Sequence, residues 1–196
     1  MNNTVCFFNV VLIKDIILIV SSITTIVISF YGLNKWKKEH KGKLRYELSR
    51  NVLKAVLNLR ESFKEIRNPM MWPHELSSEH GANARESEKW SYLFNKRLKS
   101  IQSDCNEFST FLPEVEIEFD KETNSLCNEL TDHFRKQHRA ISEYIQLVDN
   151  CDQENPRFKK VYNVVFNDSD DNETTIAFNK TIDALKEKLS KEMQSI

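Results

Sequence analysis

The side chains with the most suitable chemistry for metal binding in this sequence are its histidines. His133 follows Glu129 by four residues, so the two side chains share one face of a predicted helix, whereas His138 lies on another face. A zinc site needs three or four converging ligands, and this pair supplies two. We therefore predict no metal site. A site in the loop that contains His74 and His80, next to two glutamates, is the alternative.

An acidic segment near residue 170 begins like a calcium-binding loop, with Asp168, Asp170 and Asn172 at alternate positions. Glu173 stands where such a loop requires glycine, and Asn179 stands where it requires a bidentate glutamate. We therefore interpret this segment as a solvated acidic loop and not as a calcium site.

The cysteines do not indicate a redox or catalytic role. The four of them include no C-x-x-C pair and are too few for a disulfide scaffold, so reduced thiols in the cytoplasm are expected. Cys105 and Cys127 lie on or beside apolar stripes and are interpreted as core residues, and Cys151 lies in a predicted loop. No nucleophile elbow, Walker loop or H-E-x-x-H motif occurs. We predict no catalytic residues, no cofactor and no enzyme activity, with a metal-dependent hydrolase as a third hypothesis.

The composition favours long helices as the elements that position these side chains. Only 3 Gly and 4 Pro occur among 196 residues, too few for a many-stranded sandwich or for glycine-rich phosphate loops. The 28 Lys and Arg nearly balance the 29 Asp and Glu, so no overall charge recruits nucleic acid. The predicted fold is all-α, with an N-terminal transmembrane helix that continues into a cytoplasmic bundle of about four helices.

The segment from Ile16 to Leu33 is long and apolar enough to span a membrane. Its 18 residues carry no charge and rise about 27 Å as a helix, against a hydrocarbon layer about 30 Å thick. Upstream, Lys14 is opposed by Asp15, whereas six cations follow the span closely. This asymmetry predicts an inner-membrane protein with its N-terminus outside and its C-terminal domain in the cytoplasm. A cleaved signal sequence is the alternative, although its charges would precede the apolar core.

The residues directly after the span are basic and aromatic. At this position we expect them to bind anionic lipid headgroups, worth about 1 kcal/mol per cation, in preference to nucleic acid. They are Lys35, Trp36, Lys37, Lys38, Lys41, Lys43 and Arg45.

Hydroxyl side chains form a stripe within the span. Ser22, Thr25 and Ser29 are spaced three and four residues apart and share one helix face. Their hydroxyls either bond to carbonyl groups of their own helix or contact the span of another copy. We select the three as candidate membrane-helix contacts, and a water-lined pore is an extension of the second interpretation.

Composition and charge divide the chain into four parts. From Lys35 to Arg67 there are 11 Lys and Arg against 4 Asp and Glu, whereas the following residues have 16 against 24. We assign residues 1–15 to an extracytoplasmic segment and residues 16–33 to a transmembrane helix. Residues 34–67 are assigned to a basic juxtamembrane helix, and residues 68–196 to a cytoplasmic helical domain. We favour continuation of the transmembrane helix into residues 1–15, over a segment that lies in the interface or folds back.

Apolar stripes at helical spacing predict four helices after the span. They run from Leu44 to Ile66, from Trp90 to Leu112, from Leu126 to Val148 and from Phe178 to Met193. Asn68 and Pro69 end the first of these, and Pro113 ends the second or begins another helix. Residues 115–120 are expected to form a helix start or an extended connector, and residues 161–166 are ambiguous.

The segment between the first two of these helices contains Pro73 and Gly81 and is predicted to be a long loop. It begins with Met70, Met71 and Trp72, large apolar side chains that must be buried or bound. We select these three residues as the candidate binding site for a protein partner.

The layout resembles that of known bacterial membrane proteins. Trp36, Lys37, Lys38 and Glu39 precede Gly42, Lys43 and a helix from Leu44 to Ile66 that ends at Arg67, Asn68 and Pro69. Over residues 30–72 this pattern resembles uncharacterised bacterial proteins with one N-terminal membrane helix. It is also similar in architecture to transmembrane effectors of retron-type antiphage systems, which damage the membrane when triggered. The resemblance implies a role in antiviral defence and carries over no catalytic residues.

The leading functional hypothesis is a single-pass membrane-anchored effector or sensor. Its helical bundle would bind an unidentified protein and relay the bound state to the lipid bilayer. The mechanical reason is a single helix that is expected to run from the span through Phe63. Such a relay implies a homo-oligomer, and no direct nucleic-acid binding is expected. The alternative is a passive anchor or scaffold that tethers another protein.

Overall fold

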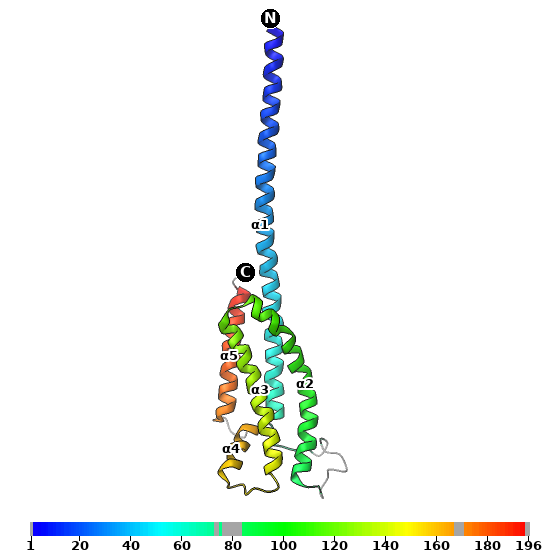
Figure 1. Cartoon of the computed structure of the whole chain (residues 1–196), viewed down its shortest axis with the longest axis vertical. Helices are drawn as coiled ribbons and strands as arrows, with labels where there is room; N and C mark the ends of the chain where they lie inside the picture. Colours follow the sequence, from blue (N-terminus) through cyan, green and yellow to red (C-terminus); the bar gives the residue numbers. More distant parts are fainter. Residues whose placement is uncertain (1, 73–74, 76–83, 167–170, 195–196) are drawn as a thin grey trace. The chain divides into compact units, whose positions relative to one another are not determined.

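The computed structural model of the chain describes residues 2–72, 75, 84–166 and 171–194, with the side chains of residues 2–13 and of Ser100 left out. Every regular element within these residues is an α-helix, which confirms the predicted all-α class. Five helices follow one another in the order shown in Figure 1. They are α1 (Asn2–Ile66), α2 (Glu86–Glu118), α3 (Lys121–Leu147), α4 (Pro156–Val165) and α5 (Glu173–Gln194).

The chain divides into two compact units, Met1–Leu44 with Ile196, and Arg45–Ser195. In the first unit, the helix begins at Asn2, so the segment before Asp15 extends it as favoured from the sequence. Its apolar window has no buried residue, and by length and composition α1 is the one helix in the described residues that is able to cross a membrane. Such exposure differs from that of a core helix in a soluble protein, whose apolar side chains are buried.

The second unit contains residues of all five helices, because α1 continues into it as far as Ile66. In Figure 1, α2, α3 and α5 run alongside this last part of α1, and α4 lies at one end of α3. The predicted stripe of α1 is buried from Leu48 to Ile66, with Val52, Val56 and Leu59 at most 1% exposed, whereas its first residue, Leu44, is 53% exposed. The helix α1 ends at Ile66, two residues before Asn68, as expected from the low α-helical preference of a residue before proline.

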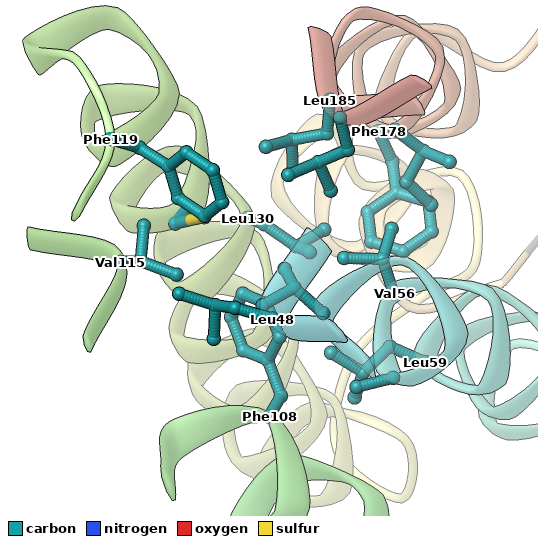
Figure 2. Packing of buried hydrophobic residues seen from close by; sticks show 14 of the residues in the cluster. Leu48, Val56, Leu59, Phe108, Val115, Phe119, Leu130, Phe178 and Leu185 are labelled. Atoms are coloured by element: carbon teal, nitrogen blue, oxygen red, sulfur yellow. The ribbon is translucent and has the colours of Figure 1, made fainter. Parts of the chain in front are cut away.

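Two clusters of apolar side chains form the core of this unit. The first joins α1, α2, α3 and α5, and Figure 2 shows Leu48, Leu130 and Leu185 converging within it. Phe63 and Phe178 stack in this cluster with their ring centroids 3.8 Å apart. The second cluster is rich in aromatic rings and joins the end of α1 to α2, α3 and α4. Its rings include Trp90, Phe94, Tyr144, Phe158 and Phe166.

The expected helix boundary at Pro113 is wrong, because α2 continues through the proline to Glu118. Proline in a helix interior costs about 3 kcal/mol through a lost hydrogen bond and a steric clash. Continuation of the helix buries Val115 and Phe119, which are 0% and 9% exposed and point into the core in Figure 2. Burial of two such side chains contributes about 1.5–3 kcal/mol each, enough to offset the proline. Val115 therefore belongs to the last turns of α2 and not to a connector or a new helix.

The ambiguous segment at residues 161–166 belongs to a short helix, so the second unit contains one helix more than the four expected. Asn155 caps this helix, α4, by accepting a hydrogen bond from the Arg157 amide at 2.9 Å, and Pro156 occupies the first turn. Val161 and Val165 are buried in the aromatic cluster. The helix is short because its apolar face serves mainly to close that cluster.

Candidate functional site

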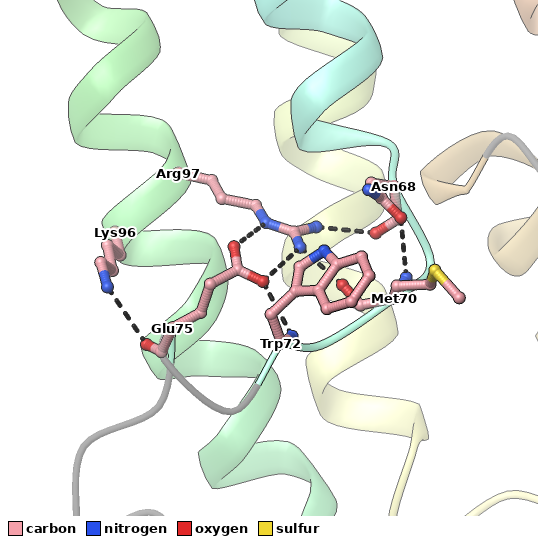
Figure 3. Close-up of polar contacts among 6 residues, drawn as sticks. All are labelled: Asn68, Met70, Trp72, Glu75, Lys96 and Arg97. Carbon is pink, nitrogen blue, oxygen red and sulfur yellow. Dashed lines mark hydrogen bonds and ion pairs between the residues drawn. The ribbon is translucent and has the colours of Figure 1, made fainter.

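Arg97 of α2 fixes the segment that follows α1, as Figure 3 shows. Its guanidinium donates to the carbonyl oxygens of Asn68 and Met70, each at 2.7 Å. It also donates to both carboxylate oxygens of Glu75, at 3.1 Å from Nε and 3.0 Å from Nη2. The side chains of Arg97 and Glu75 are only 3% and 14% exposed, so this ion pair lies largely away from water.

The segment itself completes the hydrogen bonding around this arginine. A carboxylate oxygen of Glu75 accepts from the Trp72 amide at 3.0 Å, and the Asn68 side chain accepts from the Met70 amide at 2.9 Å. Charge-assisted and bidentate hydrogen bonds are the strongest of their kind and restrict geometry most. The backbone from Asn68 to Trp72 is therefore held in one conformation by contacts that converge on Arg97.

The three predicted partner-binding residues do not share one environment. Met70 and Trp72 are 58% and 47% exposed, whereas Met71 packs against the aromatic core cluster. Two large apolar side chains thus project to solvent from a backbone that a buried ion pair holds in place. The rest of the predicted loop is described only at Glu75 and Ala84, and His74 and His80 lie outside the described residues.

A second buried arginine joins the ends of three helices. Arg67, 1% exposed, follows α1 and donates to the Phe166 carbonyl at 2.9 Å and to the Asn172 side chain at 2.8 Å. The Asn172 amide group donates in turn to the Asn163 carbonyl at 2.7 Å, and its oxygen accepts from the Thr175 amide at the start of α5. This network connects α1, α4 and α5 through polar contacts in the core.

Replacement of Asn172 by alanine is expected to lower the free energy of unfolding by about 2–3 kcal/mol. The change removes the cap of α5 and the buried hydrogen bonds that Asn172 makes to the Arg67 guanidinium and to the Asn163 carbonyl. Chemical denaturation measures the loss. Asn155→Ala is the matched control, because Asn155 is exposed and caps α4 alone, so its loss is expected to be about 1 kcal/mol. Equal losses in the two variants would contradict the buried network.

The predicted Glu129–His133 pair has its side chains on one face of α3, with the carboxylate 4.0 Å from Nε2. Thr181 of α5 donates to the Glu129 carboxylate at 3.0 Å and lies 3.5 Å from His133 Nε2. These three side chains therefore join α3 to α5. In the part of the chain that the structure describes, no three histidine, cysteine or acidic side chains lie close enough together to hold a metal ion.

Burial lowers the pKa of His133 below its usual value of 6.5, although the nearby Glu129 charge opposes the shift. The unfolded chain then binds a proton more readily than the native protein, so stability is lost as the pH falls through 6.5. We expect the urea midpoint to decrease from pH 7.5 to pH 5.5, and to decrease less in His133→Gln. The exposed His138→Gln is the control and should behave like the wild type. A wild-type slope in His133→Gln would refute the assignment.

The hydroxyl stripe of the span adopts the first of its two predicted arrangements in this chain. Ser22, Thr25 and Ser29 each donate to a carbonyl four residues earlier, at 2.8 Å. Ser21 and Thr24 likewise donate to their own helix, at 2.9 and 2.8 Å. All five hydroxyl donors are thus used locally on an exposed helix surface.

The candidate headgroup-binding residues fall into two groups. Those before Leu44 are exposed on α1. Trp36 stacks on His40 with ring centroids 5.3 Å apart, and Lys35 lies 3.8 Å from Glu39. Arg45 differs, because its guanidinium pairs with Glu192 at 2.9 Å and lies over the Phe119 ring. Arg45 is therefore engaged by the helical unit, whereas Lys37, Lys38, Lys41 and Lys43 remain exposed.

The remaining candidates from the sequence are the cysteines and the calcium-like segment, and those that the structure describes have no feature of a reactive or metal-binding group. Burial raises the pKa of the Cys127 thiol to about 12, which disfavours the reactive thiolate, and it also raises the pKa of Cys105. Asn172 belongs to the segment that was expected to be a solvated acidic loop. That expectation is wrong at this residue, because Asn172 is buried and caps α5. Asp168 and Asp170 lie outside the described residues.

Sequence reasoning missed the buried polar residues Arg67, Arg97 and Gln137. Arg97 and Gln137 occupy helical positions within apolar stripes, and the interval of seven residues between Phe134 and Ile141 contains Gln137 near its middle. Gln137 is 2% exposed and donates to the Val165 carbonyl at 2.9 Å. A polar side chain on a core-facing stripe was the available signal for these two, whereas Arg67 follows the end of its stripe at Ile66.

No family model matches the chain, and no curated protein or solved structure is similar to it.

Proposed function

We propose that this chain is a single-pass membrane protein whose helical unit binds a partner protein and relays the bound state to the lipid bilayer. The observation that carries the proposal is the composition of α1, which includes both the exposed apolar segment and core residues from Leu48 to Ile66. A helix with these two parts is able to transmit a change in core packing as a rotation or a shift.

The proposed orientation places the N-terminus outside and the helical unit in the cytoplasm, at the inner membrane. The exposed lysines that follow the span support this direction, because cations are retained on the cytoplasmic side and attracted to anionic headgroups. Tyr31 and Trp36, 74% and 59% exposed, supply the amphipathic rings typical of a membrane interface.

The proposed partner site is formed by Met70 and Trp72. Exposed tryptophan and methionine side chains are enriched at protein interfaces, and a fixed backbone lowers the entropy lost on binding. The contacts of Arg97 supply this rigidity. Met71 packs inward and is proposed to report partner binding to the core.

We further propose that the relay serves antiviral defence, with the membrane as the target of an effector. Cells that express the full chain are challenged with a panel of phages while a potential-sensitive dye is recorded. We expect depolarisation after at least one challenge in wild-type cells, and none in cells that carry Met70→Ser with Trp72→Ser. Ile176→Ser, at another exposed apolar residue, is the control. An unchanged potential under every challenge would refute the effector role.

The second candidate function is a passive anchor or scaffold. The local bonding of all five span hydroxyls favours it, because such a helix requires no particular neighbour in lipid. Replacement of residues 16–33 by an unrelated leucine-rich anchor separates the two functions. A scaffold retains its function after the exchange, whereas a relay or a pore loses it.

A further inference from the structure

The C-terminal end of α2 carries charge and apolar surface that the chain itself does not balance. Ile117 is 78% exposed; Glu114 shares its helix face three residues earlier, and Glu116 and Glu118 flank it in the sequence. The C-terminus of a helix bears partial negative charge, which favours cations, yet the last turn of α2 has no basic residue. None of the three glutamates forms an ion pair with another described residue. We call these four residues the acidic end of α2.

A surface of opposite charge lies on a face of α1 that is mostly turned away from the core, although its Leu53 also packs against the first core cluster. Tyr46, Arg50, Leu53 and Leu57 follow one another at spacings of four, three and four and therefore share one helix face. Tyr46 is 42% exposed, Arg50 is exposed, and the two leucines are half-buried. Lys54 is exposed beside this face. We call these five residues the outer face of α1.

Neither cation of the outer face is neutralised within the described residues, since Arg50 and Lys54 take part in no ion pair there. The two surfaces also lie at the same end of the second unit. Arg45, next to Tyr46, has its guanidinium 5.5 Å from the centroid of the Phe119 ring, directly after α2. The two surfaces carry opposite charge, lie at the same end of the second unit and form no ion pairs within the described residues. Such surfaces fit a contact between neighbouring chains.

We propose that the acidic end of α2 docks on the outer face of α1 in a second copy of this chain. Ile117 then packs on Tyr46 and Leu53, and the glutamates face Arg50 and Lys54. Apolar contact surrounded by complementary charge provides both affinity and register. The two surfaces differ, so each copy donates one and receives the other. Such a heterologous contact closes into a ring when copies stand parallel and the rotation between neighbours divides a full turn. The parallel arrangement rests on the proposed function.

Zero-length carbodiimide crosslinking tests the contact in the full chain. Isotopically light and heavy protein is purified separately in mild detergent, mixed, equilibrated and crosslinked. We expect peptides that join Lys54 to Glu114, Glu116 or Glu118 with one light and one heavy partner. Crosslinks confined to one isotope would be intramolecular and would overturn the proposal, as would their absence.

Matched variants measure the contribution of each surface. Ile117→Ser is expected to weaken association in sedimentation equilibrium at least about tenfold, because a large apolar side chain no longer becomes buried. Ile176→Ser removes an apolar side chain that is 53% exposed on α5 and should leave association unchanged. Equal effects of the two substitutions would refute the proposal.

Charge reversal distinguishes a specific contact from a loss of folding. Arg50→Glu with Lys54→Glu should weaken association, and addition of Glu114→Lys and Glu116→Lys in the same chain should restore it. Failure of this restoration, with circular dichroism unchanged, would overturn the proposal. The result is independent of the membrane-potential assay: intermolecular crosslinks without depolarisation would refute only the effector role, and depolarisation without crosslinks would refute only this contact.

Discussion

Replacement of Arg97 by alanine should lower the free energy of unfolding by about 3–5 kcal/mol. The substitution removes the cation that pairs with the carboxylate of Glu75, which is 14% exposed, and the donors to two main-chain carbonyls. Loss of one member of a buried ion pair is costly because the remaining charge stays desolvated. Chemical denaturation followed by far-ultraviolet circular dichroism measures the change.

Arg135→Ala provides the comparison for this variant. Arg135 also pairs with a carboxylate, Asp132 at 2.9 Å, but both side chains are mostly exposed, so its loss should cost less than about 1 kcal/mol. In a background with Trp36→Phe and Trp90→Phe, Trp72 fluorescence adds a local measurement, since the Arg97 variant should release the segment and shift the emission to longer wavelength. A small loss of stability with unchanged emission would show that Arg97 does not hold the segment.

Two arginines within the apolar segment should prevent its stable insertion into a membrane. Ile23 and Ile26 are 57% and 63% exposed on the same side of α1, at a spacing of three residues. An arginine near the centre of a transmembrane helix costs about 3 kcal/mol, so Ile23→Arg with Ile26→Arg costs about 6 kcal/mol together. Carbonate extraction of membranes should release the variant and retain the wild type.

Ile23→Leu with Ile26→Leu is the control for this experiment, because it preserves both the apolar character and the helix. That control should remain in the carbonate-resistant fraction. Retention of the double arginine variant would indicate that the segment is held by protein contacts and not by lipid. Recovery of the wild type in the soluble fraction would refute the proposed anchor.

The helices were predictable because their apolar side chains recur at helical spacing. The stripe is buried from Leu48 to Ile66, although Leu44 at its start is exposed, and the break after it follows from the low helical preference of Asn68 before a proline. The end of α2 was not predictable from local preference. At Pro113 the cost of proline in a helix competes with burial of Val115, and only the surrounding helices determine which effect is larger.

The candidate site was predictable only in part, for a related reason. Met70 and Trp72 were identified as unusual apolar residues in a loop, but the sequence does not reveal that Arg97 fixes their backbone. Arg97 is 27 to 29 positions from the residues whose carbonyls it contacts, so no local pattern connects them. An arginine on an amphipathic helix is also exposed in most proteins, so its burial was not expected. Long-range polar pairing of this kind depends on tertiary packing and leaves little trace in local patterns.

The five serine and threonine hydroxyls of the proposed span have a consequence for biogenesis. Each donates to a carbonyl within about one turn of its own helix, so these side chains would present no unmet donor to hydrocarbon. If the segment is a membrane anchor as proposed, its insertion would not have to wait for a second chain. Copies would then accumulate and diffuse laterally as monomers, and the step that brings them together would be left to surface density and to the helical unit.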